Sequence, residues 1–310
     1  VVIGLLYVGA MVVLNLPPVT HAMGQGLADA LGKKLHTEVS VGGVEIKNFH
    51  QITLRNIQIK DQQQAPLMDA HIFSIHLALR PLLQHNLVIK HMGLYQATLH
   101  LKKASAETTP NYQFLIDRLA SEEDSTEKGM KLKAHSFICR DIRVKYDVAD
   151  QFQTPGRLNA AHIDLQHLSA NLRINHLTKD SVNFRLRNIH FKEQKGLTIK
   201  KMQLKGIMAQ GRLQIVDLHM EMPHTKVHIP QAEIQLKPQP CLCSAQMNAT
   251  VAPQDFACLL PQMQALASTP YAVDLNFRQD GHHLNADGSL ADSRHENLLC
   301  KLSEISESPK

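Results

Sequence analysis

Residues 45–80 read "EIKNFHQITLRNIQIKDQQQAPLMDAHIFSIHLALR". In the second half of this stretch, apolar residues alternate with small or polar ones, the apolar set being Phe73, Ile75, Leu77 and Leu79. An alternation of period two is typical of a β-strand with one apolar face and one face in water. The stretch therefore predicts a strand that is apolar on one side only.

The same one-sided alternation recurs along most of the chain. It is clearest around Leu99 and Leu101, around Val144, and around Phe184 and Leu186. Elsewhere it comes as short apolar pairs, such as Ile52/Leu54 followed by Ile57/Ile59. We expect roughly a dozen strands joined mostly by short polar turns. Two or three short helices are too few to cover such strands as in an α/β protein.

The fold class that follows is mainly β. The sheet either closes on itself or forms an elongated, curled antiparallel trough with an apolar inside. The outward positions, among them His76, Thr98 and Lys145, are too polar to face lipid, which disfavours an outer-membrane barrel. Residues 37–290 form this β region, with helical insertions near 111–121, beginning with Asn111 as N-cap, and near 253–266.

The first 16 residues, "VVIGLLYVGAMVVLNL", are apolar and carry no charge. A membrane-spanning helix needs about 20 such residues, so we expect a single-pass anchor that has lost residues at its start. Pro17 and Pro18 then begin an amphipathic helix over residues 17–36. Its apolar stripe fits either a helix that caps a core or a helix at a membrane surface: Val19, Met23, Leu27, Leu31 and Leu35.

Charge and cysteine content exclude several classes of protein. The net charge is +5 with 19 histidines neutral, and no stripe of Lys and Arg alternates with aromatic residues, so nucleic acid is not an expected partner. The five cysteines lack C-x-x-C spacing, which argues against a zinc ribbon or a thioredoxin site. Cys241 and Cys243 are close enough in sequence for a strained disulfide; otherwise the cysteines are small apolar residues.

No catalytic, metal or cofactor signature accompanies the strands. G-x-S-x-G, P-loop and G-x-G-x-x-G motifs are absent from the sequence. Histidine pairs such as His219/His224 are five residues apart, so their side chains point to opposite faces of a strand and predict surface residues. Asp61, Asp141 and Asp147 indicate turns or solvated positions. We therefore expect no enzyme, no metal and no cofactor.

Several stretches in this order resemble the AsmA-like superfamily, and within it the N-terminal portion of the TamB translocation and assembly modules of Bacteroidota. They are the apolar segment with "LPPVTHAMGQGLADALGKKLHTEVSVGGVEI", the run from "ITLRNIQIKDQQQ" to "LYQATLHL", "NYQFLIDRL", and "VAPQDFACLLPQM". Together they span nearly the whole chain. The family runs several times longer and ends in a further β domain, so residues 291–310 are expected to be a truncated tail.

The resemblance implies a protein anchored in the inner membrane with its bulk in the periplasm. Family members are implicated in moving phospholipids toward the outer membrane and in assembling outer-membrane proteins with a TamA-like barrel. The resemblance carries no catalytic residues. It implies that phospholipid acyl chains lie along an apolar β-groove, while headgroups stay at its wet rim.

We take nine residues as candidates for the lining of this groove: Phe73, Ile75, Leu77, Leu79, Leu99, Leu101, Val144, Phe184 and Leu186. A closed apolar core has the same sequence pattern, so each of them can equally pack as a core residue. Two other functions remain open. One is a factor that pairs its strands with nascent outer-membrane proteins, and the other is a passive spacer.

Overall fold

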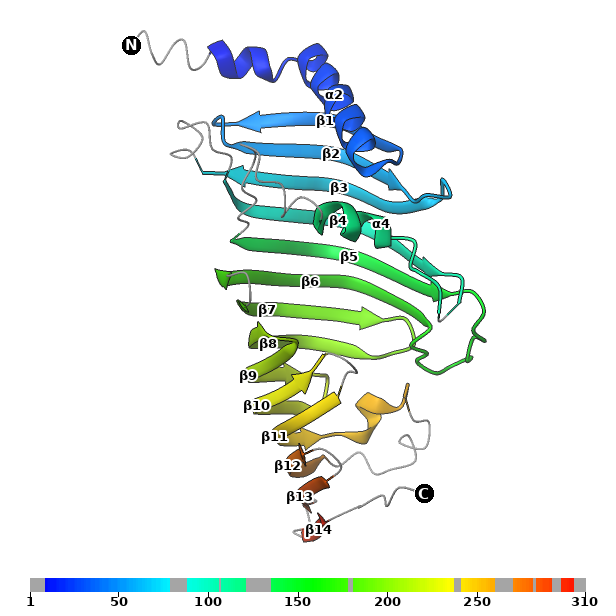
Figure 1. Ribbon diagram of the computed structural model, residues 1–310, viewed down its shortest axis with the longest axis vertical. Helices are drawn as coiled ribbons and strands as arrows, with labels where there is room; N and C mark the ends of the chain where they lie inside the picture. Colours follow the sequence, from blue (N-terminus) through cyan, green and yellow to red (C-terminus); the bar gives the residue numbers. More distant parts are fainter. Residues whose placement is uncertain are drawn as a thin grey trace. The chain divides into compact units, whose positions relative to one another are not determined.

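The computed structural model describes residues 9–78, 88–105, 107–120, 135–177, 181–236, 241–259, 270–280, 283–291 and 297–303. The described chain is mainly β. Its fourteen strands follow one another in sequence order, and each is hydrogen-bonded to the next (Figure 1). The chain divides into two compact units. Unit 1 is Val1–Thr154 with Asn159–Ser169, and unit 2 is Pro155–Leu158 with Ala170–Lys310.

Unit 1 holds five strands and the first half of a sixth: β1 (Val39–Lys47), β2 (Gln51–Lys60), β3 (Pro66–Leu77), β4 (Ile89–Lys103), β5 (Ser136–Val148) and β6 (His162–Leu177). Its helices are α2 (Pro17–Leu35) and α4 (Gln113–Ala120). Unit 2 holds the end of β6 and eight more strands: β7 (Ser181–Glu193), β8 (Thr198–Ala209), β9 (Arg212–Glu221), β10 (Lys226–Gln235), β11 (Cys241–Val251), β12 (Tyr271–Asp280), β13 (His283–Ala291) and β14 (Asn297–Ser303).

The prediction of a purely antiparallel sheet is wrong at one place. β4 and β5 pair in parallel, with Leu94 opposite Cys139 and Leu99 opposite Val144. A parallel pair needs a long crossover connection, usually a helix, and α4 lies within the connection between these two strands. The helical insertion expected near 111–121 therefore has a topological role, because it returns the chain to the same end of the sheet.

A row of backbone positions with left-handed φ crosses the strands of unit 1. Asn56 in β2, Gln96 in β4 and Asp141 in β5 have φ values of 50°, 51° and 57°. Each lies where the alternation of apolar residues changes phase, so that Ile52/Leu54 and Ile57/Ile59 belong to one strand. A residue with positive φ in a strand locally re-aims the side chains that follow. The apolar residues before and after these positive-φ positions thus lie on one face of the sheet.

Unit 2 also has residues with positive φ inside its strands. Asn188 in β7 has a φ of 54° and Asp217 in β9 has a φ of 58°. The β8–β9 register shifts between Gln203/His219 and Lys205/Val216, which makes Asp217 part of a β-bulge. The apolar pairs Leu213/Ile215 and Leu218/Met220 therefore also lie in a single strand.

The apolar face of unit 1 is a packed core. Strand register places apolar residues in rows across β1 to β5, and one such row is Val41, Ile57, Ala70, Ala97 and Ile142. These five side chains are only 2–8% exposed. Each Å² of apolar surface that such rows remove from water contributes about 25 cal/mol to stability. This face is therefore the main source of stability in unit 1.

Helix α2 packs on the first strand of this face (Figure 1). Gly24 is buried, and a Cβ atom at this position would lie 3.3 Å from the Val41 carbonyl oxygen and 3.8 Å from its Cγ1 atom. Glycine thus lets the helix approach the strand closely. Of the expected apolar stripe, Leu35 is buried and the other four residues are half-buried. This packing matches a helix that caps a core.

The side chain of Asn15, which precedes α2, forms hydrogen bonds with the backbone of β1. The Asn15 amide donates to the Ile46 carbonyl oxygen at 2.9 Å, and its Oδ1 atom accepts from the Ile46 N–H at 3.2 Å. Residues 9–14 are helical. Within the described residues, no helix has both the length and the apolar character needed to cross a membrane. Half of the expected anchor, residues 1–8, lies outside the described part.

Asn111 is not the N-cap of α4, which begins at Gln113. Its side chain instead bonds the backbone of β4. Oδ1 accepts from the Lys102 N–H at 2.8 Å, and Nδ2 lies 3.0 Å from the His100 carbonyl oxygen and 3.1 Å from Asp61 Oδ2. Asp61 is 2% exposed, and its Oδ1 accepts from two backbone N–H groups of its own turn. Asp61 and Asn111 together fix the entry to α4 onto the sheet.

The helix pair expected near 253–266 has a shorter counterpart in the described residues. Pro253–Phe256 form a single 3-10 turn, η1, and residues 260–269 lie outside the described part. The turn is fixed to the start of β10, because the Ala252 N–H donates to Thr225 Oγ1 at 2.9 Å. Asp255 accepts from the His224 N–H at 2.9 Å. The sequence also predicts one helical turn over residues 81–86, which lie outside the described residues.

Candidate functional site

The candidate lining residues of unit 1 lie in apolar rows of the sheet. Phe73 pairs with Leu94 and Ile75 pairs with Met92, while Leu99 pairs with Val144 across the parallel β4–β5 ladder. Two residues further along the same ladder, Leu101 pairs with Tyr146. The sequence therefore indicated the correct face for these residues.

Their exposure differs from that of an open groove. Leu77 is buried at 8% exposure, while Phe73, Ile75, Leu99, Leu101 and Val144 are half-buried. The neighbours that complete the row of Phe73 are more deeply buried, with Leu54 3% and Leu94 8% exposed. In the middle of unit 1 the apolar side chains thus pack against one another as core residues. Leu79 lies outside the described residues.

Phe184 and Leu186 belong to the apolar face of unit 2. Phe184 lies opposite Gly206 and Leu186 opposite Leu204 in the β7–β8 pair. A Cβ atom at Gly206 would come within 2.4 Å of Phe184 Cζ, so the ring lies directly over this glycine. The row through Phe184 continues over β8 to β13: Gly206, Ile215, Ala232, Ala245, Phe277 and Ala286.

Part of the apolar face of unit 2 is more exposed than the apolar face of unit 1. Met208, Leu242 and Leu275 are 41%, 41% and 37% exposed. Around them, Met247, Val273 and Phe277 are half-buried, as are the candidate lining residues Phe73 and Leu99 of unit 1. We did not select these residues from the sequence, although the alternation of Val273, Leu275 and Phe277 in β12 was visible there. Periodicity identifies the face of a strand but not what covers it.

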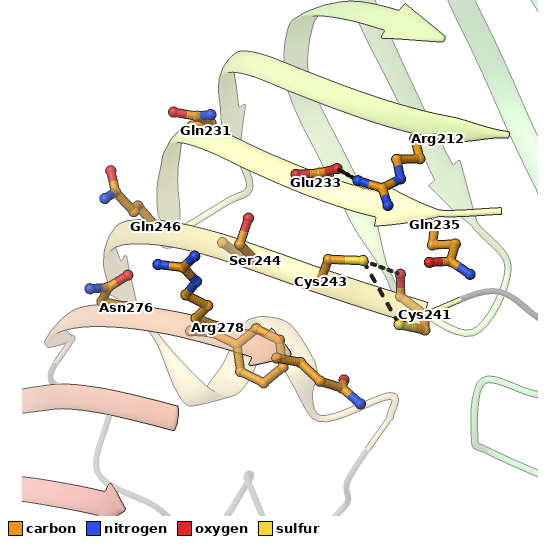
Figure 2. A pocket seen from close by; sticks show the side chains of 13 residues that line it. Arg212, Gln231, Glu233, Gln235, Cys241, Cys243, Ser244, Gln246, Asn276 and Arg278 are labelled. Atoms are coloured by element: carbon orange, nitrogen blue, oxygen red, sulfur yellow. Dashed lines mark hydrogen bonds and ion pairs between the residues drawn. The ribbon is translucent and has the colours of Figure 1, made fainter. Parts of the chain in front are cut away.

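The opposite face of unit 2 is polar and carries a hollow of about 620 Å³ over β9 to β12. Figure 2 shows its lining, in which the guanidinium of Arg212 is paired with Glu233 at 3.0 Å. The sulfur atoms of Cys241 and Cys243 are 4.0 Å apart, so these thiols are free and not joined in a disulfide. Arg278, Gln246 and Asn276 complete the polar wall. This lining suits water and polar groups better than acyl chains.

Several acidic residues have histidine partners. Asp141 Oδ1 lies 2.7 Å from His167 Nδ1, and Asp147 Oδ1 lies 2.6 Å from His162 Nδ1. The hydrogen bond with Asp147 raises the pKa of His162. These are pairs between neighbouring strands on the polar face. Asp61 is a buried turn residue, as the turn assignment of the sequence predicted.

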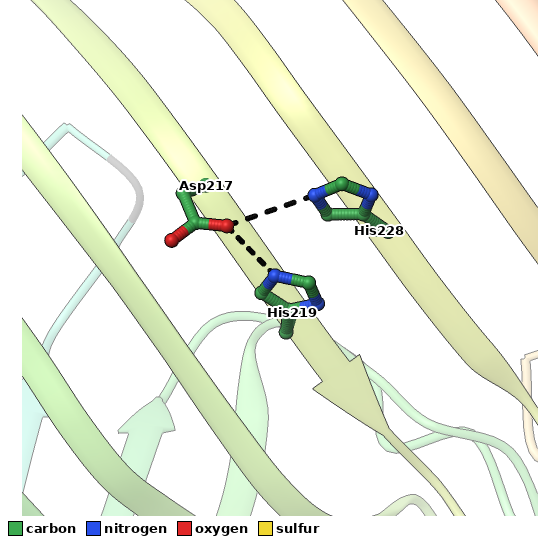
Figure 3. Close-up of side chains that lie close together, drawn as sticks. All are labelled: Asp217, His219 and His228. Carbon is green, nitrogen blue, oxygen red and sulfur yellow. Dashed lines mark hydrogen bonds and ion pairs between the residues drawn. The ribbon is translucent and has the colours of Figure 1, made fainter.

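Sequence reasoning missed one cluster, because its members become neighbours only through strand pairing. Asp217 and His219 in β9 meet His228 in β10 (Figure 3). His219 is directly opposite His228 in the ladder. The sequence does contain a signal for this cluster, which is the hairpin centred on Pro223–His224. Aligning β9 and β10 about this turn places His219 opposite His228.

No protein-family model, curated protein or solved structure matches this chain.

Proposed function

We propose that this chain is a non-catalytic, membrane-associated protein that holds lipid acyl chains along the apolar face of unit 2, in the manner of the TamB and AsmA-like proteins that its sequence resembles. The observation that supports this proposal is the exposure of Met208 in β8, Leu242 in β11 and Leu275 in β12 on one face of the sheet. Exposed apolar surface of this extent commonly marks a lipid or protein contact.

The dimensions of this face suit an acyl chain. Apolar rows run over the six strands β8 to β13, which at about 4.8 Å per strand span about 24 Å. The acyl layer of one leaflet is about 15 Å thick, half of the hydrocarbon core of a bilayer. Each methylene removed from water contributes about 0.8 kcal/mol, so even a partly covered tail favours this face over water.

The N-terminal end supplies the proposed membrane contact. Val12, Val13 and Leu16 are 58%, 54% and 42% exposed, and they continue the apolar run of residues 1–8. Asn15 bonds this segment to β1, so the sheet begins next to the segment that would enter the bilayer. In this proposal the anchor lies in the inner membrane and the sheet in the periplasm.

The membrane contact is tested by vesicle flotation of the chain with Val12→Asp and Val13→Asp together. Two charges on the exposed apolar side should reduce co-flotation with neutral phosphatidylcholine vesicles at least about 10-fold, because each charge in a membrane segment costs about 2.5–3.5 kcal/mol. Ala22→Asp, on an exposed position of α2, serves as the control. Equal flotation of all three proteins would contradict the membrane contact.

The lipid proposal is tested by measuring phospholipid retained by the purified chain. Leu242→Asp and Leu275→Asp place a charge on the apolar face and should remove most of the bound lipid. Asn276→Asp places the same charge on the opposite face of β12 and should leave the bound lipid unchanged. If Leu275→Asp and Asn276→Asp retain equal amounts of lipid, the proposal fails.

A second function, assembly of outer-membrane proteins with a TamA-like barrel, is favoured by one feature. β14 pairs with β13 and, within the described residues, has no strand on its other side. An unpaired strand edge can add a strand from another chain. Cross-links from β14 to an unfolded barrel substrate, without lipid adducts on the apolar face, would favour this second function over the first.

A further inference from the structure

The cluster of Asp217, His219 and His228 has the composition of a metal site. Imidazole nitrogen and carboxylate oxygen are the donors that zinc and its neighbours in the first transition row prefer. The ligand atoms of the three side chains all lie within 4.8 Å of one another. Elsewhere in the described residues, no second group of three such side chains comes together in this way.

The backbone explains why the three side chains converge. The antiparallel β9–β10 pair places His219 directly opposite His228. Asp217 is two residues before His219 and has a left-handed φ of 58° within the β-bulge. In β10 the position opposite Asp217 is Pro230, between the paired residues Ile229 and Gln231. A proline in a strand is typical of an irregular position, and here it accompanies the bulge that aims the carboxylate toward the two rings.

The side chains converge on one oxygen atom (Figure 3). Nε2 of His219 lies 2.7 Å from Asp217 Oδ1, and Nε2 of His228 lies 3.7 Å from the same atom. The two imidazole rings are stacked, with centroids 4.1 Å apart and planes within 9°. Two protonated rings in this arrangement would repel each other, whereas two neutral rings offer two lone pairs to one cation.

The remaining carboxylate oxygen has a different partner. Lys205 Nζ lies 2.9 Å from Asp217 Oδ2. The hydrogen bonds from Lys205 and then His219 lower the pKa of Asp217. Lys205 thus orients the carboxylate and leaves Oδ1 as its metal-binding atom, while its own positive charge opposes the binding of a cation.

We propose that Asp217, His219 and His228 bind a divalent transition-metal ion of the zinc class, through Oδ1 and two Nε2 atoms, on the polar face of unit 2. Tetrahedral zinc with bonds of about 2.0–2.2 Å needs ligand atoms about 3.4 Å apart. Small rotations of the two imidazoles reach this spacing, since the side chains of His219 and His228 are 45% and 40% exposed.

The fourth position of the ion has room for water or another ligand. His219 and His228 line a hollow of about 320 Å³ that extends over β11 to β12 and includes Asp274. The bound ion joins β9 to β10 at the bulge, so it stabilises this hairpin. The site lies on the face opposite to Met247 and Leu275, and it is therefore independent of the lipid proposal.

The test uses the whole chain and Zn²⁺ as the only ligand, with binding measured by calorimetry at neutral pH. His228→Asn and Asp217→Asn should each weaken the tightest zinc equivalent at least about 10-fold, because even loss of an outer-shell partner costs 10–100-fold. His190→Asn, at an exposed position of β7, is the matched control and should bind as the parent chain does. It controls for weak binding by the other histidines among the 19.

A variant with the opposite expected effect makes the test specific. Lys205→Met removes the competing positive charge and should tighten zinc binding by about 3-fold or more. With Cu²⁺ as a spectroscopic probe, electron paramagnetic resonance should show two coupled nitrogens in the parent chain and one in His228→Asn. Circular dichroism without metal checks that each variant is folded. Equal zinc affinity of the parent, His228→Asn and Asp217→Asn proteins would overturn the proposal.

Discussion

The two units use the same strand pattern with different results. In unit 1 the apolar rows are closed, with Leu54 3% exposed and Ile142 2% exposed. In unit 2 part of the equivalent face remains open, with Leu275 37% and Leu242 41% exposed, while Ala232 on the same face is 4% exposed. Helix α2 packs on the apolar face of unit 1, whereas the helical structure described in unit 2 is limited to the short turn η1. A one-sided strand thus becomes a core or a surface according to what covers it.

The largest expected difference between the units is the cost of shortening an apolar side chain. Leu54→Ala should destabilise unit 1 by about 2–5 kcal/mol, since it opens a cavity in a packed core. Leu275→Ala should cost unit 2 at most about 1 kcal/mol, because its side chain is already partly in water. Urea denaturation measures both effects, and hydrogen exchange assigns each to its unit. Equal costs would show that the two faces do not differ in packing.

A smaller effect is expected where α4 is fixed onto unit 1. Asn111→Ala should cost about 2–3 kcal/mol, since it removes the hydrogen bonds of this side chain to Oδ2 of the buried Asp61 and to two backbone groups of β4. Gln62→Ala removes a hydrogen bond to the His36 carbonyl oxygen on the exposed side of the same turn, and should cost less than about 0.5 kcal/mol. If these two variants have equal stability in urea denaturation, Asn111 does not hold α4.

In unit 2, a methyl group at Gly206 should displace the ring of Phe184. Gly206→Ala is expected to cost about 1 kcal/mol, near the lower end for overpacking, because the ring can swing away from the new Cβ atom. Combining it with Phe184→Leu should remove most of this cost. Gly43→Ala, where no atom lies within 4 Å of the new Cβ, is the control. A full cost in the double variant would mean that Phe184 does not lie over Gly206.

The smallest effects concern pH, and two histidines of unit 1 should act in opposite directions. Desolvation, then the charges of His91 and His50, lower the pKa of His76. The unfolded chain therefore binds this proton first, and His76 destabilises the fold as pH falls below about 6.5. The raised pKa of His162 has the opposite sign, because its contribution is complete below about 6.5 and is lost as pH rises through its folded value.

Thermal melts between pH 5 and 8 measure these contributions. His76→Gln should make unit 1 lose less stability in acid than the parent chain. His162→Gln should make it lose more, because the stabilising proton of His162 is missing. Parallel curves for the two variants would contradict this assignment.

The sequence predicted which side of each strand is apolar, and the rows through Phe73, Leu99 and Phe184 confirm the mainly β fold. It did not predict the parallel β4–β5 pair, although the long connection with its helix was visible. Pairing direction depends on where the chain returns, and alternation within a strand carries no information about this.

The degree of burial of the candidate lining residues could not be predicted from the sequence either. Leu77 and Leu275 have similar alternating neighbours, yet one is 8% exposed and the other 37%. The difference arises from the rest of the fold, which covers one face more than the other. The cluster at Asp217 has the same cause, since His219 and His228 meet only through the β9–β10 register.

The most direct test of the account is photo-cross-linking in phospholipid vesicles with a benzophenone amino acid at three positions of the whole chain. At Leu275, on the exposed apolar face of unit 2, we expect phospholipid adducts. At Asn276, on the opposite face, and at Leu54, in the core of unit 1, we expect few or none. Equal adduct yields at all three positions, or adducts confined to Asn276, would contradict the proposal that the open apolar face of unit 2 holds lipid.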